Sequence, residues 1–363
     1  MAHFTSDTYQ LKRHILNFSA KVSKKLHKPE RKFTADMTYG ILASQSCLLT
    51  DIADQLHEPS RKINVVDRLS RHLANGVPND SLSAFLSLVK RWCPNHPVSI
   101  FSEIHSSAEK DFTSINDVTF SAMERAQKVF GSATFVMDRG YDDNKMFLKL
   151  DLMKQKYVIR LTSKRKLLYH NKWTPATELR NRRKGKVKLP LLYRGKQHEA
   201  YLSHVKVQIT ASRKDIYLVL VYGITEHPMM LATNMEIRSK EDVISVAKMY
   251  FSGWKIEEYF RCKKQVFRFE DFRVRKLRAI NALNFYITLC MAFLAHMSMK
   301  PETNALKVSI IKKADPVKKK VYFCYYRLAK GISGILSYAK QGVRLWFRTK
   351  RPAYRQLCLK LVV

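Results

Sequence analysis

Three side chains at seven-residue spacing form the most chemically suggestive pattern in this sequence. Tyr250, Glu257 and Lys264 recur at nearly two turns of an α-helix, so all three would project from one face. Trp254 and Arg261 fall on the same stripe. A helical stripe that packs into a core is apolar, whereas this one combines aromatic rings, a carboxylate and cations. The pattern favours a partly buried, functional carboxylate, and a solvated face with ion pairs is the alternative.

A second carboxylate stands where a buried strand is expected to end. The apolar run from Ala133 to Met137 is typical of a strand that is covered on both faces, and Asp138 follows it directly. Because α/β folds bind ligands at the carboxyl ends of their strands, Asp138 is a candidate functional group. Position alone favours the alternative interpretation, in which Asp138 is a turn residue beside Gly140.

The composition indicates a polyanionic partner. Lys and Arg number 66 against 30 Asp and Glu in 363 residues, which gives a formal charge of +36. Nucleic acid is the commonest partner of so basic a chain. A hydrophobic content of 46% excludes a disordered basic tail, and 11 Gly and 11 Pro exclude collagen-like and low-complexity chains. Positive charge concentrates in residues 164–188, 261–278 and 307–320.

Cysteines and apolar runs narrow the class of protein further. The six cysteines form no C-x-x-C pair, so neither a zinc finger nor a disulfide framework is expected. The N-terminus lacks the apolar segment of a secretory signal. Residues 279–299 contain no Lys, Arg, Asp or Glu, but their Asn, Thr and His residues favour a buried core helix over a membrane span. We therefore expect a cytoplasmic protein without a membrane partner.

The elements that would position these groups change in character along the chain. Residues 1–92 read as helical, and two periodic runs on either side of Pro59 predict either a helix-turn-helix or an ordinary helical hairpin. The second run carries Arg68, Arg71 and His72. Beyond this region we expect the first part of an α/β layer at 97–162 and a basic β-rich region at 163–235. A segment at 236–299 would hold a long helix from about 240 to 264 and an apolar helix at 276–299, and a basic helical region would follow at 300–363.

The sequence around both carboxylates resembles a known family. The run from Tyr250 to Lys264, Tyr-Phe-Ser-Gly-Trp-Lys-Ile-Glu-Glu-Tyr-Phe-Arg-Cys-Lys-Lys, resembles the signature helix of the DDE transposases of bacterial insertion sequences. Tyr, Arg, Glu and Lys at set spacing define that helix, and here Gly253 stands in place of the Arg. The run from Val136 to Asp142 resembles the segment with the family's second catalytic Asp, and the resemblance extends over most of the chain.

The resemblance implies both a fold and a reaction. The fold is α/β, with a ribonuclease-H-like core, a β-rich insertion and an all-α N-terminal region. Asp138 and Glu257 would be catalytic carboxylates that hold Mg²⁺ (or Mn²⁺) for DNA cleavage and strand transfer by two-metal phosphoryl transfer. The implied partners are the double-stranded DNA of transposon ends and target and a second copy of the chain, in a bacterial, nucleoid-associated location. The side chains that would contact DNA are Tyr250, Trp254, Arg261, Lys263 and Lys264.

One part of the implied core is missing from the sequence. A ribonuclease-H-like core opens with three antiparallel strands, and its first catalytic Asp lies on the first of them. Only Cys93 to His96 separate the helical region from the family-like sequence that resumes at Pro97. The single strand candidate is Val98–Phe101, which would be the third strand, and Glu103 is the acid that follows it. We therefore expect a truncated sheet and an incomplete active site.

Other functions compete with an active transposase. A truncated site would leave a catalytically inactive DNA-binding transposase remnant, or an inhibitor of an intact transposase. A basic RNA- or ribosome-associated protein fits the charge as well, but the stripe formed by Tyr250, Glu257 and Lys264 has no purpose in such a protein.

Overall fold

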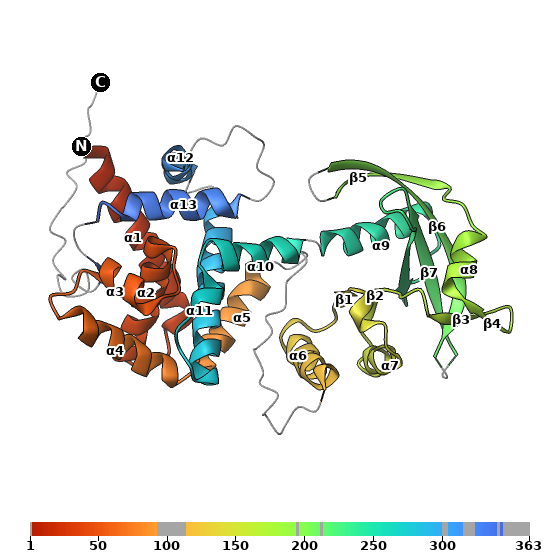
Figure 1. Ribbon diagram of the computed structural model, residues 1–363, viewed down its shortest axis with the longest axis horizontal. Coiled ribbons are helices and arrows are strands. Elements are labelled where there is room, and N and C mark those ends of the chain that lie inside the picture. Colours follow the sequence, from red (N-terminus) through yellow and green to blue (C-terminus); the bar gives the residue numbers. More distant parts are fainter. Residues whose placement is uncertain are drawn as a thin grey trace. The chain divides into compact units, whose positions relative to one another are not determined.

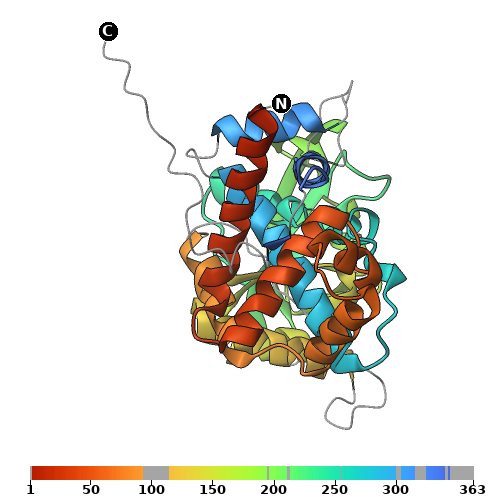
Figure 2. The ribbon, with the colours of Figure 1, turned by 90° about the vertical axis from the view of Figure 1, so that its left-hand side faces the viewer.

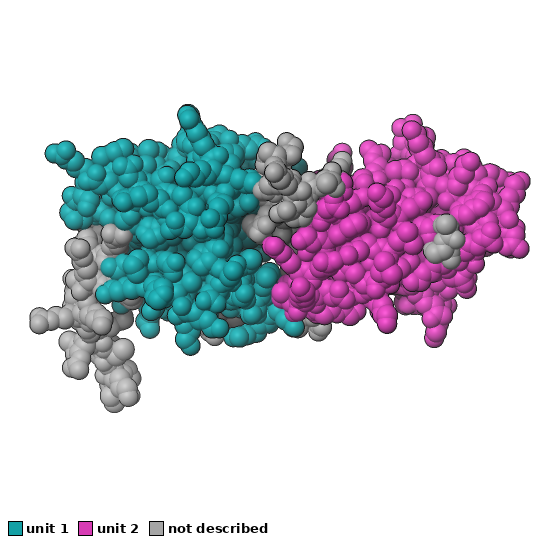
Figure 3. Space-filling view, turned by 90° about the horizontal axis from the view of Figure 1, so that it is seen from below, with its two compact units in different colours: residues 1–92, 259–363 teal, residues 93–258 magenta. Residues whose placement is uncertain are grey.

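The chain forms two compact units. This computed structural model describes residues 2–92, 114–193, 196–210, 213–253, 255–299, 304–314, 324–339 and 342–343. Residues 1–92 and 259–363 make up one unit, the helical unit, and residues 93–258 make up the other, the α/β unit (Figure 3). The expected core segment 97–162 and the basic region 163–235 thus belong to one unit. The expected segment 236–299 is shared, because the boundary falls after Glu258.

A mixed sheet organises the α/β unit. The described part of this unit contains eight strands in one sheet, and β1 (Thr134–Met137) runs parallel to β2 (Lys156–Arg160). β8 (Met229–Thr233) continues the sheet antiparallel to β2. The remaining strands are β7 (Lys214–Tyr222), β6 (Lys196–Ile209), β3 (Lys166–Tyr169) and β4 (Lys172–Pro175), in that order, with β5 (Val187–Tyr193) paired to β6. The predicted β-rich region is therefore hydrogen-bonded into the same sheet as the core strands.

Helices cover both faces of this sheet. Along β7, Leu218 and Leu220 pack in one buried cluster, while Val219 and Val221 pack in another, as side-chain alternation on a strand requires. The first cluster includes residues of α6 (Ile115–Phe130), α7 (Asn144–Leu152) and the short α8 (Ala176–Asn181). The second includes the apolar side of α9 (Lys240–Ser252), which lies across the opposite face (Figure 1). The result is a three-layer α/β arrangement.

β1 lies at the edge of the described sheet. Its hydrogen-bonded neighbour among the described residues is β2, and the side chain of Val136 is 36% exposed. The strand expected at Val98–Phe101 and the acid at Glu103 both lie outside the described residues. The predicted truncation of the sheet is therefore still a prediction.

The predicted long helix is interrupted, so the expectation of one continuous helix from 240 to 264 is wrong. α9 ends at Ser252, and α10 (Lys255–Gln265) begins after Gly253 and Trp254. The Gly253 N–H donates to the Tyr250 carbonyl at 3.1 Å, which tightens the last turn of α9. Glycine disfavours a helix interior by about 1 kcal/mol relative to alanine, so Gly253 favours the end of α9 at this position.

The helical unit is built around α11 (Leu277–Met299). This helix is long and apolar enough to cross a membrane by length and composition, yet 72% of its most apolar window is buried inside the protein. Helices α2 and α4 pack against it, in agreement with the predicted core helix (Figure 2). The other elements of this unit are α1 (Ala2–Ser23), α2 (Lys28–Ser44), α3 (Leu49–Leu56), α4 (Lys62–Ala74), α5 (Asn79–Trp92), η2 (Phe269–Asp271), α12 (Asn304–Lys313) and α13 (Tyr325–Leu336).

Two polar side chains of α4, the second helix of the α3–α4 pair, pack inside the helical unit. Arg68 forms ion pairs with Asp36 at 2.9 Å and with Glu58 at 2.6 Å, and the Asp36 side chain is fully buried. His72 stacks on Phe33 with ring centroids 4.8 Å apart. The helix pair is present, but Arg68 and His72 are committed to packing inside the helical unit.

Candidate functional site

Asp138 lies at the carboxyl end of β1, as the sequence predicts. Its Oδ1 accepts a hydrogen bond from the Gly140 N–H at 2.8 Å, and its carbonyl accepts one from the Tyr141 N–H at 3.2 Å. These bonds start the 3₁₀ turn η1 (Arg139–Tyr141). Asp138 is exposed, and no described residue donates a hydrogen bond to its Oδ2. Asp138 therefore caps the turn through its Oδ1 and keeps its Oδ2 available for a ligand.

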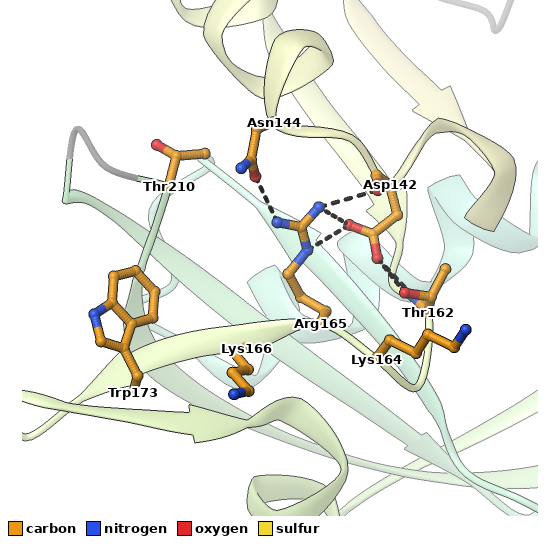
Figure 4. Close-up of a pocket in the computed structure, with 8 residues that line it drawn as sticks. All are labelled: Asp142, Asn144, Thr162, Lys164, Arg165, Lys166, Trp173 and Thr210. Atoms are coloured by element: carbon orange, nitrogen blue, oxygen red, sulfur yellow. Dashed lines mark hydrogen bonds and ion pairs between the residues drawn. The ribbon is translucent and has the colours of Figure 1, made fainter.

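A buried ion pair fixes the turn that follows Asp138. The carboxylate of Asp142 is fully buried and accepts hydrogen bonds from the Thr162 N–H at 2.7 Å and the Thr162 hydroxyl at 2.8 Å. Arg165 lies 2.6 Å from the same carboxylate and also donates to the Asn144 side chain at 2.6 Å (Figure 4). These contacts tie the turn after β1 to the loop after β2 and hold the backbone that carries Asp138.

Tyr250 shares this edge of the sheet with Asp138. Burial raises the pKa of Tyr250, the hydrogen-bonded Arg160 side chain opposes that shift, and the charge of Asp138 adds to it. A Cβ atom placed on Gly253 would lie 3.5 Å from Cγ1 of Val136, so the end of α9 lies against β1. The structure therefore brings together Tyr250 from α9, Arg160 from β2 and Asp138 from the end of β1.

Glu257 lies in the first turn of α10 and is exposed. A carboxylate in the first turn is stabilised by the positive end of the helix dipole. The neighbouring Glu258 is buried, at 7% exposure. Glu257 belongs to the same α/β unit as Asp138. That the carboxylates of Asp138 and Glu257 lie close together remains a prediction.

The expected DNA-contacting residues of α10 fall into two environments. Arg261 and Lys264 are exposed, and Lys264 pairs with Glu270 at 2.5 Å. Both share one face of α10 with Glu257, because they follow it by four and seven residues. Trp254 lies outside the described residues.

Lys263 occupies a position that does not suit the predicted phosphate contact. Its side chain is 3% exposed, and its ammonium group donates to the side-chain oxygens of Asn284 at 2.7 Å and Thr288 at 2.8 Å. The same group lies 4.7 Å from the ring centre of Tyr259. Burial lowers the pKa of Lys263 to about 7. This lysine packs α10 against α11, because it follows Tyr259 by four residues and so shares its face of α10, and both side chains contact Thr288 of α11.

Comparison with known proteins decides the family. The sequence model of the Transposase DDE domain matches residues 102–293, more than half of the chain. The chain belongs to the transposase DDE-domain family. Asp138, Tyr250 and Glu257 all lie inside the matched range. No curated protein matches the chain.

The transposase domain offers donor atoms suited to a hard divalent cation. Carboxylate oxygens are the ligands that Mg²⁺ prefers, and the Oδ2 of Asp138 receives no hydrogen bond from a described residue. Within the described ranges, no three His, Cys, Asp or Glu side chains are grouped so as to hold a metal ion. By chemistry, Asp138 and Glu257 are each a suitable oxygen ligand for such an ion.

Sequence reasoning missed two parts of this edge. Arg160 ends β2, and its neighbour β1 is parallel, so the carboxyl ends of both strands had to meet at one edge. The α/β layer that the sequence predicts for residues 97–162 carries this signal. The second missed part is a cavity lined by Asp142, Asn144, Thr162, Lys164, Arg165, Lys166, Trp173 and Thr210. Its members come from four separate stretches of the chain, and no spacing in the sequence connects them.

Proposed function

We propose that this chain is an insertion-sequence transposase that binds transposon-end DNA and whose active site for cleavage and strand transfer is incomplete. The observation that carries the proposal is the position of Asp138 beside Tyr250 and Arg160, inside the region that matches the transposase DDE domain. An acidic group, a phenol and a guanidinium at one sheet edge can hold and orient a phosphodiester. The net charge of +36 supports a polyanionic substrate.

Each residue of the site has a definite task in this proposal. The Gly140 N–H holds the Oδ1 of Asp138, so that its Oδ2 points to the ligand. Arg160 contacts a non-bridging phosphate oxygen, and the Tyr250 hydroxyl that it hydrogen-bonds keeps it in place. Exposed Arg261 and Lys264 hold flanking phosphates.

Asp138 and Glu257 would hold Mg²⁺ or Mn²⁺, which, when bound, activates a water or a DNA 3′-hydroxyl and stabilises the leaving oxygen. Two carboxylates from separate elements would bind the metal ion more weakly than three, and would align the attacking oxygen less well. The same proposal includes three further points. The α/β unit has a ribonuclease-H-like core, and α10 takes the role of the signature helix. The chain assembles as a homodimer on DNA in the bacterial nucleoid.

An end-cleavage assay tests the proposal. The substrate is duplex DNA that carries the inverted repeats flanking the gene, with Mg²⁺ or Mn²⁺ and the full chain. We expect tight, salt-sensitive binding with little cleavage, and loss of the residual cleavage in Asp138→Ala/Glu257→Ala. Glu241→Ala is the matched control, because Glu241 is an exposed carboxylate on α9.

The position of β1 at the edge of the described part of the sheet favours a second candidate, a catalytically inactive DNA-binding remnant or inhibitor of an intact transposase. Binding without any cleavage that depends on Asp138 would support this candidate over the first. Robust cleavage that the double variant abolishes would show a complete site, and Glu103 would be the first acid to replace. Absence of DNA binding would contradict both.

A further inference from the structure

A cavity beside the candidate site has no role in the proposed chemistry. It has a volume of about 540 Å³ and opens among the loop after β2, the hairpin β3–β4 and the turn after β6. Figure 4 shows the ring of Trp173 at one side of the cavity and the pair of Arg165 and Asp142 at the other. Asp142 follows the Asp138 turn directly, so the cavity lies at the same carboxyl edge of the sheet.

The register of the β3–β4 hairpin places a cation next to the aromatic ring. Leu168 pairs with Trp173, and Lys166 pairs with Pro175. Residues opposite each other and residues two apart share a face, so Lys166 and Trp173 are diagonal neighbours on one face of the hairpin. Diagonal neighbours lie about 7–8 Å apart, a distance that long side chains span.

The surface of the cavity combines an exposed ring with excess positive charge. Trp173 is 46% exposed, although tryptophan is usually largely buried. Lys164 and Lys166 are exposed, and no described carboxylate forms an ion pair with either of them. The charge of Arg165 is already balanced by the buried Asp142. The cavity therefore carries about two uncompensated positive charges beside a flat aromatic surface.

This combination fits one kind of ligand. An unstacked nucleobase stacks on an aromatic side chain, and lysines neutralise the phosphates next to it. The volume lies in the usual range for a small-ligand pocket, about 300–1,000 Å³. A duplex keeps its bases stacked on one another, so its backbone would use the lysines but leave the Trp173 ring without a partner.

We propose that this cavity binds one unstacked nucleotide of a single DNA strand, with its base on Trp173 and its phosphates at Lys164 and Lys166. The proposal rests on the proposed function, since it assumes that DNA is the substrate. It adds a subsite for unpaired DNA next to the Asp138 turn.

The test measures affinity for labelled single strands by fluorescence anisotropy with the full chain. The probes are a twelve-residue oligo(dT) and the same backbone with abasic sugars. Trp173→Ala should weaken oligo(dT) binding roughly ten- to a hundredfold, because a stacked base contributes about 1–3 kcal/mol. It should leave affinity for the abasic strand unchanged, and Trp173→Phe should retain most of the affinity for oligo(dT).

Two controls make the outcome specific. Tyr201→Ala removes an equally exposed aromatic ring, 41% exposed, from the same sheet and should have no effect. Lys164→Ala/Lys166→Ala should lower the magnitude of the log–log salt slope for oligo(dT) by about 1.4, which corresponds to two phosphates on a single strand. Lys172→Ala, on the same hairpin but outside the cavity, should leave that slope unchanged.

Several results would overturn the subsite. One is that Trp173→Ala and Tyr201→Ala bind oligo(dT) with equal affinity. Another is that Trp173→Ala loses as much affinity for the abasic strand as for oligo(dT). The third is that the unmodified chain does not bind oligo(dT). In each case, continued salt-sensitive binding of duplex DNA would leave the proposed function standing. If the unmodified chain binds neither duplex nor single strand, the proposed function fails together with the subsite.

Discussion

The guanidinium of Arg165 lies 2.6 Å from the carboxylate of Asp142, and this pair joins the turn after β1 to the loop after β2. The Asp142 side chain has no exposed surface, and that of Arg165 is 13% exposed. Two further hydrogen bonds from Thr162 satisfy the carboxylate. The pair thus forms one wall of the cavity and, through the chain, sets the position of Asp138.

Removing one partner of this pair should be costly. Arg165→Ala leaves the Asp142 carboxylate buried without its counter-charge, and breaking a buried pair in this way typically costs about 3–5 kcal/mol of unfolding free energy. Denaturant unfolding checks the loss. The control is Arg182→Ala, because Arg182 pairs with Glu178 on the surface and such pairs contribute about 0–1 kcal/mol. Similar stabilities of the two variants would contradict a structural role for Arg165.

DNA binding should depend steeply on salt. The charge of +36 and the exposed basic region around β5 and β6 predict binding mainly through phosphates, with a log–log slope of magnitude on the order of 5–10 for duplex DNA. Titrations across 50–300 mM NaCl would measure the slope. A slope near zero would rule out phosphate-dominated binding.

The stability of the helical unit should carry a pH signature of Lys263. Its pKa in the folded chain is about 7, below the ordinary 10.5, so the unfolded chain holds more protons between these values. Burial of the charged ammonium group therefore destabilises the folded chain by its full amount below pH 7, and this destabilisation decreases as the pH rises from 7 toward 10.5. Any advantage of Lys263→Met over the unmodified chain should therefore shrink by on the order of 1 kcal/mol per pH unit between pH 7.5 and 8.5.

Urea unfolding at several pH values measures this difference. Lys264→Met serves as the matched control, since Lys264 is an exposed neighbour on the same helix. A pH dependence that is the same for Lys263→Met and the unmodified chain would mean that Lys263 is not buried in its charged form.

Placing an arginine at position 253, where the signature helix that this run resembles carries one, should change both helix continuity and DNA affinity. Gly253 has a φ of −61°, so a side chain there meets no backbone strain, although its Cβ would lie 3.1 Å from the Tyr250 carbonyl oxygen. Gly253→Arg should strengthen duplex binding and raise the magnitude of the salt slope by about 0.9, which equals one phosphate contact.

Gly253→Ala separates the two effects. It adds helix propensity of up to about 1 kcal/mol without adding charge. Circular dichroism would report the gain in helix for both variants. An increase in affinity of the same size in Gly253→Ala would assign the effect to helix continuity rather than to a phosphate contact.

The sequence predicted the regular elements better than their connections. The apolar run before Asp138 located β1, and the region expected to be rich in strands at 163–235 contains β3 to β8. These patterns are local, so a short window of sequence contains them. The break at Gly253 was also local, but the seven-residue spacing of Tyr250 and Glu257 outweighed the glycine in the prediction.

The sequence did not predict which charged side chains are buried in the fold. In the sequence, Lys263 and Arg68 look like exposed basic residues, because the side chains that contact them in the fold, Asn284 and Asp36, lie far away along the chain. The cavity around Trp173 depends on the register of a hairpin and on a loop from another strand. Such contacts follow from tertiary packing and leave no periodic trace in the chain.

The pairing of β2 with β8 has a consequence for biosynthesis. β2 is made early, but its antiparallel neighbour lies beyond the whole basic region from β3 to β7. While the ribosome translates that region, β1 and β2 have no β8 to complete their sheet. The α/β unit must therefore fold late, after β8 leaves the ribosome, and a chain truncated within the basic region would expose a bare sheet edge.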